Sequence, residues 1–457
     1  MHLRTYQQDM TTLLQRHYQK GGRAPLAVLP TGAGKTVVFA WIAKQAAAKG
    51  NRVMILVHRD FLLDQTSEKL AAMGVPHGII APDYPQTDDL VQVASVHTVV
   101  RRFHRLREPV LIIIDEAHHA PAGQWTKVIQ FYRYAKILGV TATPDRMDGT
   151  VLGFDGLYVG ATVKQLTADG WLVPARVYAP PIVADLAGLH MARSGDYQRA
   201  EIEDRLDRAT VTGDAVQHYL KYAPGLSGVA FCCSVEHARH VAATFTNAGV
   251  PAQHIDGSMT KLERKRIMRA FAQGGIKLLT SCELISEGFD LPEVAVAILL
   301  RPTESLGLYL QQVGRALRPS PGKQAAIILD HVGNCIKHGL PDDEREWNMD
   351  GRKKRKTQGA LPVVTCEKCF RAHHPTRGRV CPYCQHVPEV QTRDASPIEI
   401  DGELEEVTAT QLQHIDRRWM IGRAQTLEDL YIVAHRLGYK PAWARYIWNA
   451  RAKKRGA

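Results

Sequence analysis

The sequence of 457 residues lacks any apolar run that approaches the roughly 20 residues needed to cross a bilayer. Its first ten residues, MHLRTYQQDM, contain no apolar core of the kind found in secretory signal peptides. Only eight cysteines are present, too few for a disulfide scaffold in a chain of this length. These scarcities predict a cytoplasmic protein with no membrane partner, in which clustered cysteines bind metal.

The remaining composition is that of a folded protein. Hydrophobic residues make up 45% and charged residues 23%, which excludes a largely disordered chain. At roughly 150 residues per domain, the length predicts about three domains.

Positive charge is concentrated toward the end of the sequence. The net charge is +12, and residues 345–457 hold 21 of the 58 basic residues but only 13 of the 46 acidic ones. Such a region favours a polyanionic partner, most often nucleic acid. A surface that only maintains solubility explains the composition equally well.

Short apolar segments alternate with helix-length segments in two series. This pattern predicts parallel strands in βα units and therefore an α/β fold with two tandem domains. The expected strands are 27–29, 53–57, 91–94, 111–114 and 137–140 in the first series, and 229–231, 254–255, 277–280, 296–300 and 325–329 in the second.

The organisation along the chain follows from these series and from changes in composition. The expected parts are a first α/β domain at 1–175, a second at 176–345, a basic linker at 346–362, a zinc-ribbon module at 363–390 and a helical C-terminal region at 391–457. In the last part, Thr426 and Asp429 have the spacing of a capping box. Trp443 and Ile447 fit the core of an amphipathic helix, although the aromatic and basic residues around them also suit base stacking.

A glycine-rich segment follows the first predicted strand. Glycines allow the backbone to curl, so that its N–H groups bind phosphates, while a lysine reaches the β and γ phosphates and a hydroxyl binds Mg²⁺. Leu29 occupies the place of the first glycine in the full P-loop pattern. The phosphate-binding candidates are Thr31, Gly32, Ala33, Gly34, Lys35 and Thr36.

Two carboxylates end the strand predicted at 111–114. Asp115 is expected to hold Mg²⁺, and Glu116 to act as general base toward the attacking water. A strand-end acidic pair in a turn is the structural alternative, which the upstream glycine-rich segment makes unfavourable.

Four cysteines form two Cys-x₂-Cys pairs within 19 residues. Cys366, Cys369, Cys381 and Cys384 are the expected ligands of a structural Zn²⁺. A closed four-cysteine site leaves no open position for catalysis, so its role is to fold a small module.

Further segments, in order, complete a known set of motifs. They are Leu3-Arg4-x-Tyr6-Gln7, 56–59, 95–98, Thr141-Ala-Thr-Pro144, 231–235, Ser286-Glu-Gly288-Phe-Asp290 and Gln312-Val-Gly-Arg315-Ala-Leu-Arg318. With the glycine-rich loop and Asp115-Glu-Ala-His118, they resemble superfamily 2 helicases of the DEAD/DEAH type over about 330 residues. Within that group the chain resembles RadD-like and XPB-like ATPases and type III restriction motor subunits.

The resemblance implies two RecA-like domains with ATP bound between them. Arg4 and Gln7 would contact the adenine, and Gly288 and Asp290 would contribute to the nucleotide site. Gln312, Arg315 and Arg318 would act from the second domain, because arginines on one helix face can reach the γ-phosphate. The nucleic-acid contacts implied by motif position, each of which could equally be structural, are His58, Arg59, Ser95, Thr98 and Ser281.

The sequence therefore predicts an ATP-dependent helicase or translocase with ATP, Mg²⁺ and Zn²⁺ as cofactors. DNA is preferred over RNA as its partner on resemblance alone, and repair, replication or restriction proteins are candidate protein partners. A motor that remodels DNA without separating strands remains an alternative. So does a nucleic-acid-binding adaptor without ATP turnover, against which the intact Lys35, Glu116 and Arg318 argue.

Overall fold

The structure is a computed structural model in which the chain divides into two units, Met1–Pro388 and Glu389–Ala457. It describes residues 2–57, 60–82, 84–117, 122–144, 153–179, 209–282, 294–349, 361–388, 424, 426–436, 443–445 and 447–449. The motif residues His58, Arg59, Gly288 and Asp290 lie outside the described residues.

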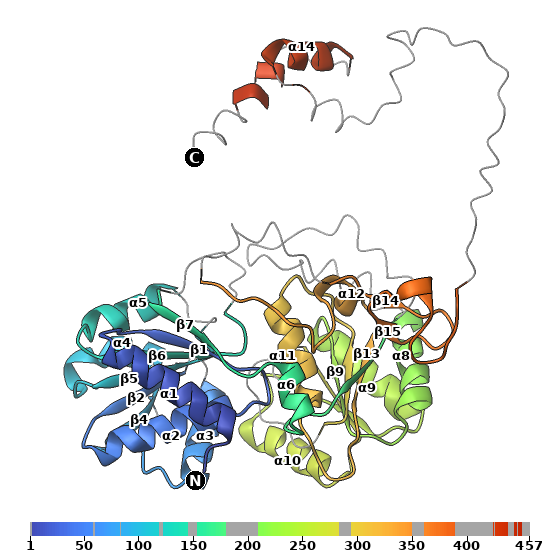
Figure 1. The fold of residues 1–457 in the computed structure, drawn as a ribbon. Coiled ribbons are helices and arrows are strands. Elements are labelled where there is room, and N and C mark those ends of the chain that lie inside the picture. Colours follow the sequence, from blue (N-terminus) through green and yellow to red (C-terminus); the bar gives the residue numbers. More distant parts are fainter. Residues whose placement is uncertain are drawn as a thin grey trace, which may run out of the picture. The chain divides into compact units, whose positions relative to one another are not determined.

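A seven-stranded parallel sheet forms the first domain (Figure 1). The strand order is β3-β4-β2-β5-β6-β1-β7. The strands are β1 (Pro25–Val28), β2 (Val53–Val57), β3 (Gly78–Ile80), β4 (Val91–Ser95), β5 (Leu111–Asp115), β6 (Lys136–Thr141) and β7 (Gly156–Val159).

Both faces of this sheet are covered by helices, which explains why its strands are continuously apolar. In β2, Val53, Ile55 and Val57 pack in one core, whereas Met54 and Leu56 pack in the other. The helices are α1 (Thr5–Gln19), α2 (Lys35–Ala48), α3 (Asp60–Ala72), α4 (Val96–Arg102), η1 (Phe103–Arg105), α5 (Ala122–Phe131) and α6 (Val163–Ala168).

A six-stranded parallel sheet in the order β10-β11-β9-β12-β13-β8 forms the second domain. Its strands are β8 (Ala175–Tyr178), β9 (Gly228–Phe231), β10 (Ala252–His254), β11 (Leu278–Ser281), β12 (Val296–Leu299) and β13 (Ala326–Asp330). Its helices are α8 (Ala209–Tyr222), α9 (Val235–Asn247), α10 (Lys261–Ala272), α11 (Leu306–Ala316) and α12 (Asn334–His338). The two sheets confirm the predicted pair of parallel α/β domains.

The cysteine-rich module consists of the antiparallel strands β14 (Val364–Thr365) and β15 (Ala372–His373) and the short helix η4 (Arg377–Arg379). It docks on the edge strand of the second domain. The backbone N–H of Ala179 donates to the carbonyl oxygen of Phe370 at 3.0 Å, and Tyr178 forms a β-bridge with Arg371.

The second unit is described only in part. Helix α14 (Leu427–Arg436) begins with the predicted capping box, because the backbone N–H of Asp429 donates to Thr426 Oγ1 at 3.1 Å and that of Thr426 donates to Asp429 Oδ2 at 2.8 Å. Trp443 and Ile447 pack against its small core, which supports their structural role. A helical region across all of 391–457 is not confirmed.

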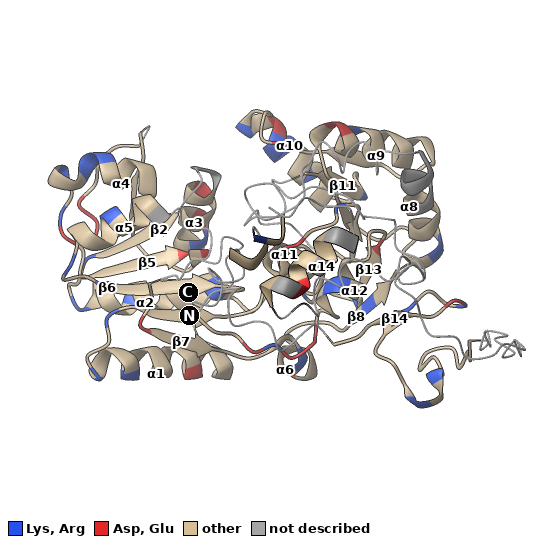
Figure 2. Ribbon diagram, turned by 90° about the horizontal axis from the view of Figure 1, so that it is seen from above, with Lys and Arg blue, Asp and Glu red and all other residues tan. Residues whose placement is uncertain are grey.

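Lys and Arg lie on several elements of the two domains, among them α4 and α10 (Figure 2). Part of the predicted basic linker, residues 350–360, lies outside the described residues. Among the helices that the structure describes, none combines the length and apolarity needed to span a membrane.

Candidate functional site

The loop between β1 and α2 presents backbone N–H groups at a helix start. Gly32 and Gly34 have φ values of +90° and +78°, which a side chain would strain. Gly34 precedes Lys35, the first residue of α2, and no side chain caps this end of the helix. The N–H groups are therefore oriented for an anion. Leu29, at the position of the first glycine in the full P-loop pattern, is fully buried. Its N–H donates to the carbonyl oxygen of Thr141, so Leu29 continues the pairing of β1 with β6.

The segment before α1 contacts this loop directly. The carbonyl oxygen of Ala33 accepts hydrogen bonds from Gln7 Nε2 at 3.1 Å and from the Tyr6 hydroxyl at 2.9 Å. The guanidinium of Arg4 lies 3.9 Å from the ring centroid of Trp171. Arg4 and Gln7 are thus held close to the glycine-rich loop, with Trp171 as a neighbour that the sequence did not indicate.

The two carboxylates lie at the end of β5, beside the loop. Lys35 Nζ is 3.6 Å from Glu116 Oε1, and both side chains are only 12% exposed. Burial raises the pKa of Asp115 to about 6, and the Glu116 carboxylate adds to the rise whereas Lys35 opposes it. The ionised form of Asp115 is therefore unfavourable by itself, and a bound cation would offset its negative charge.

Helix α11 of the second domain completes a cavity of about 330 Å³. Its lining includes Lys35, Thr36, Asp115 and Glu116 from the first domain and Arg315 and Arg318 from the second. Gly314 allows the close approach, since a methyl group added there would lie 2.5 Å from Cβ of Thr31. The predicted phosphate, metal and arginine positions therefore meet in one cleft between the domains.

Some residues of the cleft were not predicted. Gln311, not the predicted Gln312, lines the cavity with Arg315, which lies one turn further along α11, and with Arg318, two residues beyond the end of the helix. Gln312 is fully buried. Helix α3 contributes Gln65, Thr66 and Lys69. The periodicity of α3 indicates which residues pack in the core, but not that its polar side chains face the glycine-rich loop.

The described nucleic-acid candidates are buried. Ser95, Thr98 and Ser281 are 3%, 6% and 0% exposed. Among the described residues, no hydrogen-bond partner is found for Ser281 Oγ. Ser281 is the last residue of β11 and therefore lies at the carboxyl ends of the parallel strands of the second sheet. In this conformation the three side chains contribute to the cores of the domains.

The four cysteines converge as a tetrahedral metal site requires. The Sγ atoms of Cys366 and Cys384 are 3.6 Å apart, those of Cys369 and Cys381 are 3.7 Å apart, and all four lie within 4.8 Å of one another. Zn–S bonds of about 2.3 Å give tetrahedron edges of about 3.8 Å.

The two Cys-x₂-Cys turns have matching backbones. The residues after the second cysteine of each pair, Phe370 and Gln385, have φ values of 57° and 59°. Their N–H groups donate to the carbonyl oxygens of Cys366 and Cys381 at 2.8 and 3.0 Å. Two equivalent turns that direct four sulfurs to one point fit a zinc ion.

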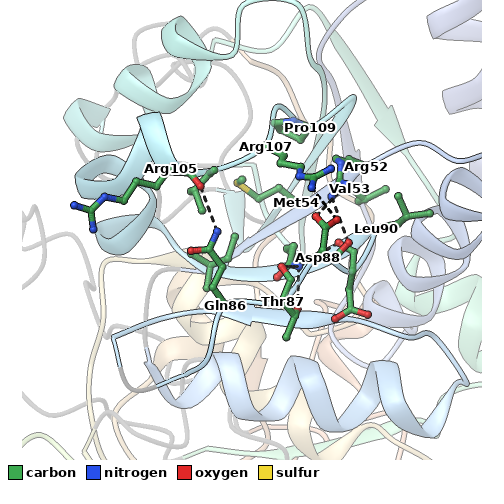
Figure 3. A pocket seen from close by; sticks show the side chains of 14 residues that line it. Arg52, Val53, Met54, Gln86, Thr87, Asp88, Leu90, Arg105, Arg107 and Pro109 are labelled. Atoms are coloured by element: carbon green, nitrogen blue, oxygen red, sulfur yellow. Dashed lines mark hydrogen bonds and ion pairs between the residues drawn. The ribbon is translucent and has the colours of Figure 1, made fainter.

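A second cavity of about 410 Å³ lies at the opposite edge of the first sheet, where β2, β4 and β5 begin (Figure 3). The carboxylate of Asp88 pairs with Arg52 at 3.1 Å and with Arg107 at 3.0 Å. Arg105 extends away from this cluster (Figure 3). The Asp88 carboxylate thus offsets part of the positive charge that the two guanidinium groups bring to this cavity.

Comparisons with known proteins agree with the geometry of the cleft. A family described as "Type III restriction enzyme, res subunit" matches residues 1–146, and "Helicase conserved C-terminal domain" matches residues 213–320. A "51.5 kDa protein" of a Lactococcus phage is 38% identical over 82% of this chain and 80% of its own length. The "Putative ATP-dependent helicase IRC3" of Saccharomyces cerevisiae is 28% identical over 72% of this chain, which spans about half (51%) of that relative.

A solved structure shares the fold. The "ATP-dependent Type ISP restriction-modification enzyme LlaBIII bound to DNA" aligns with a TM-score of 0.55 and 18% identity over 73% of this chain and 28% of that chain. The two family matches fall one in each α/β domain, and the similarity to the phage protein covers 82% of this chain. The chain therefore belongs to the superfamily 2 helicases, as an ATP-hydrolysing enzyme of the group that combines the type III restriction ATPase domain with the helicase C-terminal domain.

Proposed function

We propose that the protein is a DNA-stimulated ATPase that moves along DNA and uses this movement to separate strands. The cleft carries the proposal: a lysine and two carboxylates of the first domain face two arginines of the second across one cavity. An ATP γ-phosphate bound there bridges the domains, and its hydrolysis removes the bridge. Repeated closing and opening moves the domains relative to a bound strand.

The predicted residues of the cleft have different roles in this cycle. The N–H groups of residues 31–36 and the Lys35 ammonium bind the phosphates, and Glu116 accepts a proton from the attacking water. Arg315 and Arg318 stabilise the charge that develops on the γ-phosphate. Thr36 and Asp115 would hold Mg²⁺, which supplies further charge neutralisation when bound. Arg4 and Gln7 bind the adenine.

DNA is the proposed track. The related LlaBIII enzyme, whose fold this chain shares, was solved bound to DNA. The net charge of +12 favours a polyanion. The proposed contacts are those implied by motif position, namely His58, Arg59, Ser95, Thr98 and Ser281, with Gly288 and Asp290 next to the nucleotide. Movement of the buried Ser95, Thr98 and Ser281 toward the surface would accompany strand binding.

The four-cysteine cluster is proposed to bind one structural zinc ion. The sulfur–sulfur distances support this assignment, and the closed ligand set excludes a catalytic role for the ion. Backbone pairing with Tyr178 and Ala179 makes the module a fixed part of the second domain.

The test is ATP hydrolysis by the full chain, alone and with single-stranded DNA, duplex DNA or RNA. We expect turnover that rises most with DNA. Glu116→Gln should lower kcat by about 10²–10⁴-fold, the usual contribution of a general base, while nucleotide still binds. Wild-type protein that hydrolyses no ATP on any of these nucleic acids would contradict the motor.

Strand displacement on a tailed duplex then tests the second half of the proposal. ATP-dependent release of the shorter strand supports a helicase. Robust DNA-stimulated turnover without release identifies a translocase that remodels DNA without separating it.

A further inference from the structure

A lysine ammonium closes the C-terminal end of α11, the helix that carries Arg315 and leads into Arg318. Lys323 Nζ donates to the carbonyl oxygens of Val294 at 2.7 Å and of Arg318 at 2.7 Å, and also to that of Ala316. An ammonium has three N–H donors, so these carbonyls match its capacity. Its charge also faces the negative end of the helix dipole.

A short turn brings Lys323 back to this helix end. The intervening residues are Pro319-Ser320-Pro321-Gly322, and the backbone N–H of Lys323 donates to the carbonyl oxygen of Ser320 at 3.1 Å. Proline followed by a glycine with a φ of 77° is typical of the two central positions of a type II turn. The turn thus reverses the chain and directs the half-buried Lys323 side chain under the last turn of α11.

The carbonyls that Lys323 joins belong to segments with different roles. Arg318 lines the nucleotide cavity, and a methyl group added at Gly32 of the glycine-rich loop would lie 3.4 Å from its Cγ. Val294 lies two residues before the first residue of β12. The carbonyl oxygen of Leu317, between Ala316 and Arg318, accepts from the backbone N–H of Val173 of the interdomain connector at 2.9 Å.

We propose that Lys323 is a positioning residue for ATP hydrolysis: it fixes the backbone at Arg318 and ties it to Val294, at the entry to β12. Arg318 follows the last residue of α11 by two positions, so the helix alone does not define the direction of its side chain. Lys323 supplies this constraint. The inference rests on the proposed function, because it concerns the step in which Arg318 meets the γ-phosphate.

A residue that merely stabilised the second domain would behave differently. Its loss would lower the melting temperature and the fraction of folded enzyme, while each folded molecule would keep its turnover rate. Loss of a positioning residue lowers kcat per active site and leaves the KM for ATP nearly unchanged, because Lys35 and the glycine-rich loop still bind the phosphates.

The experiment compares Lys323→Met, Lys323→Arg and the matched control Lys49→Met, which removes the same charge at an exposed position after α2. ATP hydrolysis with saturating DNA is measured, with melting temperature and active-site concentration determined in parallel. We expect Lys323→Met to lower kcat per active site by about 10- to 100-fold, the size of a misplacement effect, with less than about a twofold change in KM. Lys323→Arg should restore much of the rate, and Lys49→Met should match wild type.

The outcomes are separable. Active wild-type protein with an unaffected Lys323→Met variant overturns this inference alone. So does a loss of kcat that disappears on correction for active sites. Wild-type protein without turnover overturns the proposed function and this inference together. If Lys323→Met does not fold, Lys323→Gln, which keeps two donors but no charge, replaces it with the same expected loss of kcat.

Discussion

At the scale of single residues, Gly314 determines how closely the two domains approach at the nucleotide cleft. Glycine within a helix normally costs about 1 kcal/mol relative to alanine. Here a Cβ atom would lie 2.5 Å from Cβ of Thr31, a β-branched residue that cannot easily turn aside. Gly314→Ala should therefore leave the melting temperature unchanged or raised and lower kcat by about tenfold or more, because the arginines no longer reach the phosphate.

The control for this prediction is Gly123→Ala in α5, where an added methyl group meets no atom within 4 Å. It should show wild-type turnover in the same assay. A Gly314→Ala enzyme with wild-type kcat would contradict the closed arrangement of the cleft as the active one.

The half-buried His331 is expected to make the second domain sensitive to acid. Burial, with a further effect from the ring of His218 at 5.1 Å, lowers the pKa of His331 from 6.5 to about 3. The unfolded chain thus binds a proton in this window that the folded chain does not. The contribution of the neutral His331 ring to the free energy of unfolding is complete above pH 6.5. It is lost as the pH falls from 6.5 toward 3.

The melting temperature of His331→Gln should therefore fall less than that of the wild type as the pH is lowered through this window. Thermal unfolding of both proteins at a series of pH values checks it, with the exposed His240→Gln as control. Parallel pH profiles for wild type and His331→Gln would exclude His331 as the cause of the acid sensitivity.

Sequence motifs indicated the candidate phosphate-binding residues because the backbone requirements of such a loop are local. Gly32 and Gly34 do adopt positive φ values. Gln311, Lys69 and Trp171 could not be identified in this way, since their positions depend on how α11, α3 and the connector pack around the loop. Lys323 was missed for the same reason: a lysine after a Pro-Gly turn reads as a surface residue until the helix end beside it is known.

At the scale of elements, the cysteine-rich module and strand β8 support each other. The module has two short strands and little core of its own, and its backbone pairs with the end of β8. Cys381→Ser should lower the zinc content from one ion per chain to near zero and reduce the melting temperature. Turnover per active site should stay within about twofold of wild type, because no cysteine of the cluster lines the nucleotide cavity.

Zinc content by elemental analysis and unfolding with and without a chelator measure these effects. His386→Gln serves as control, since its ring lies outside the four-sulfur cluster. Full zinc content in Cys381→Ser would contradict the assigned ligand set.

Ten of the thirteen strands in the two parallel sheets were predicted, most of them because strands covered on both faces are continuously apolar. In the two parallel sheets, sequence reasoning missed β3, β7 and β8, which have only three or four residues and are three of the four edge strands. At an edge one side of the strand has no partner, so the apolar signal weakens. This also explains why the segment of β8 was interpreted as part of a connector.

At the scale of the whole molecule, the domain interface contains contacts that no motif predicts. Lys261 of α10 donates to Asp64 Oδ2 of α3 at 2.9 Å, at 66% and 35% side-chain exposure. Close to the cleft, a methyl group at Gly307 of α11 would lie 2.7 Å from the Thr143 hydroxyl of the first domain. The interface therefore combines close packing beside the nucleotide cavity with an exposed ion pair at its rim.

The rim pair should bias the domains toward the closed state by a small amount. Exposed ion pairs contribute about 0.2–1 kcal/mol, so Asp64→Lys or Lys261→Asp alone should raise the KM for ATP by about 1.5- to 5-fold. The double exchange restores opposite charges at the two positions and should return the KM toward wild type. Raising the salt concentration should reduce all of these differences, because the pair is exposed to screening. If the KM of the double exchange instead shows the combined increase of the two single variants, the two charges act separately. The packed contacts at Gly307 and Gly314 alone would then determine closure.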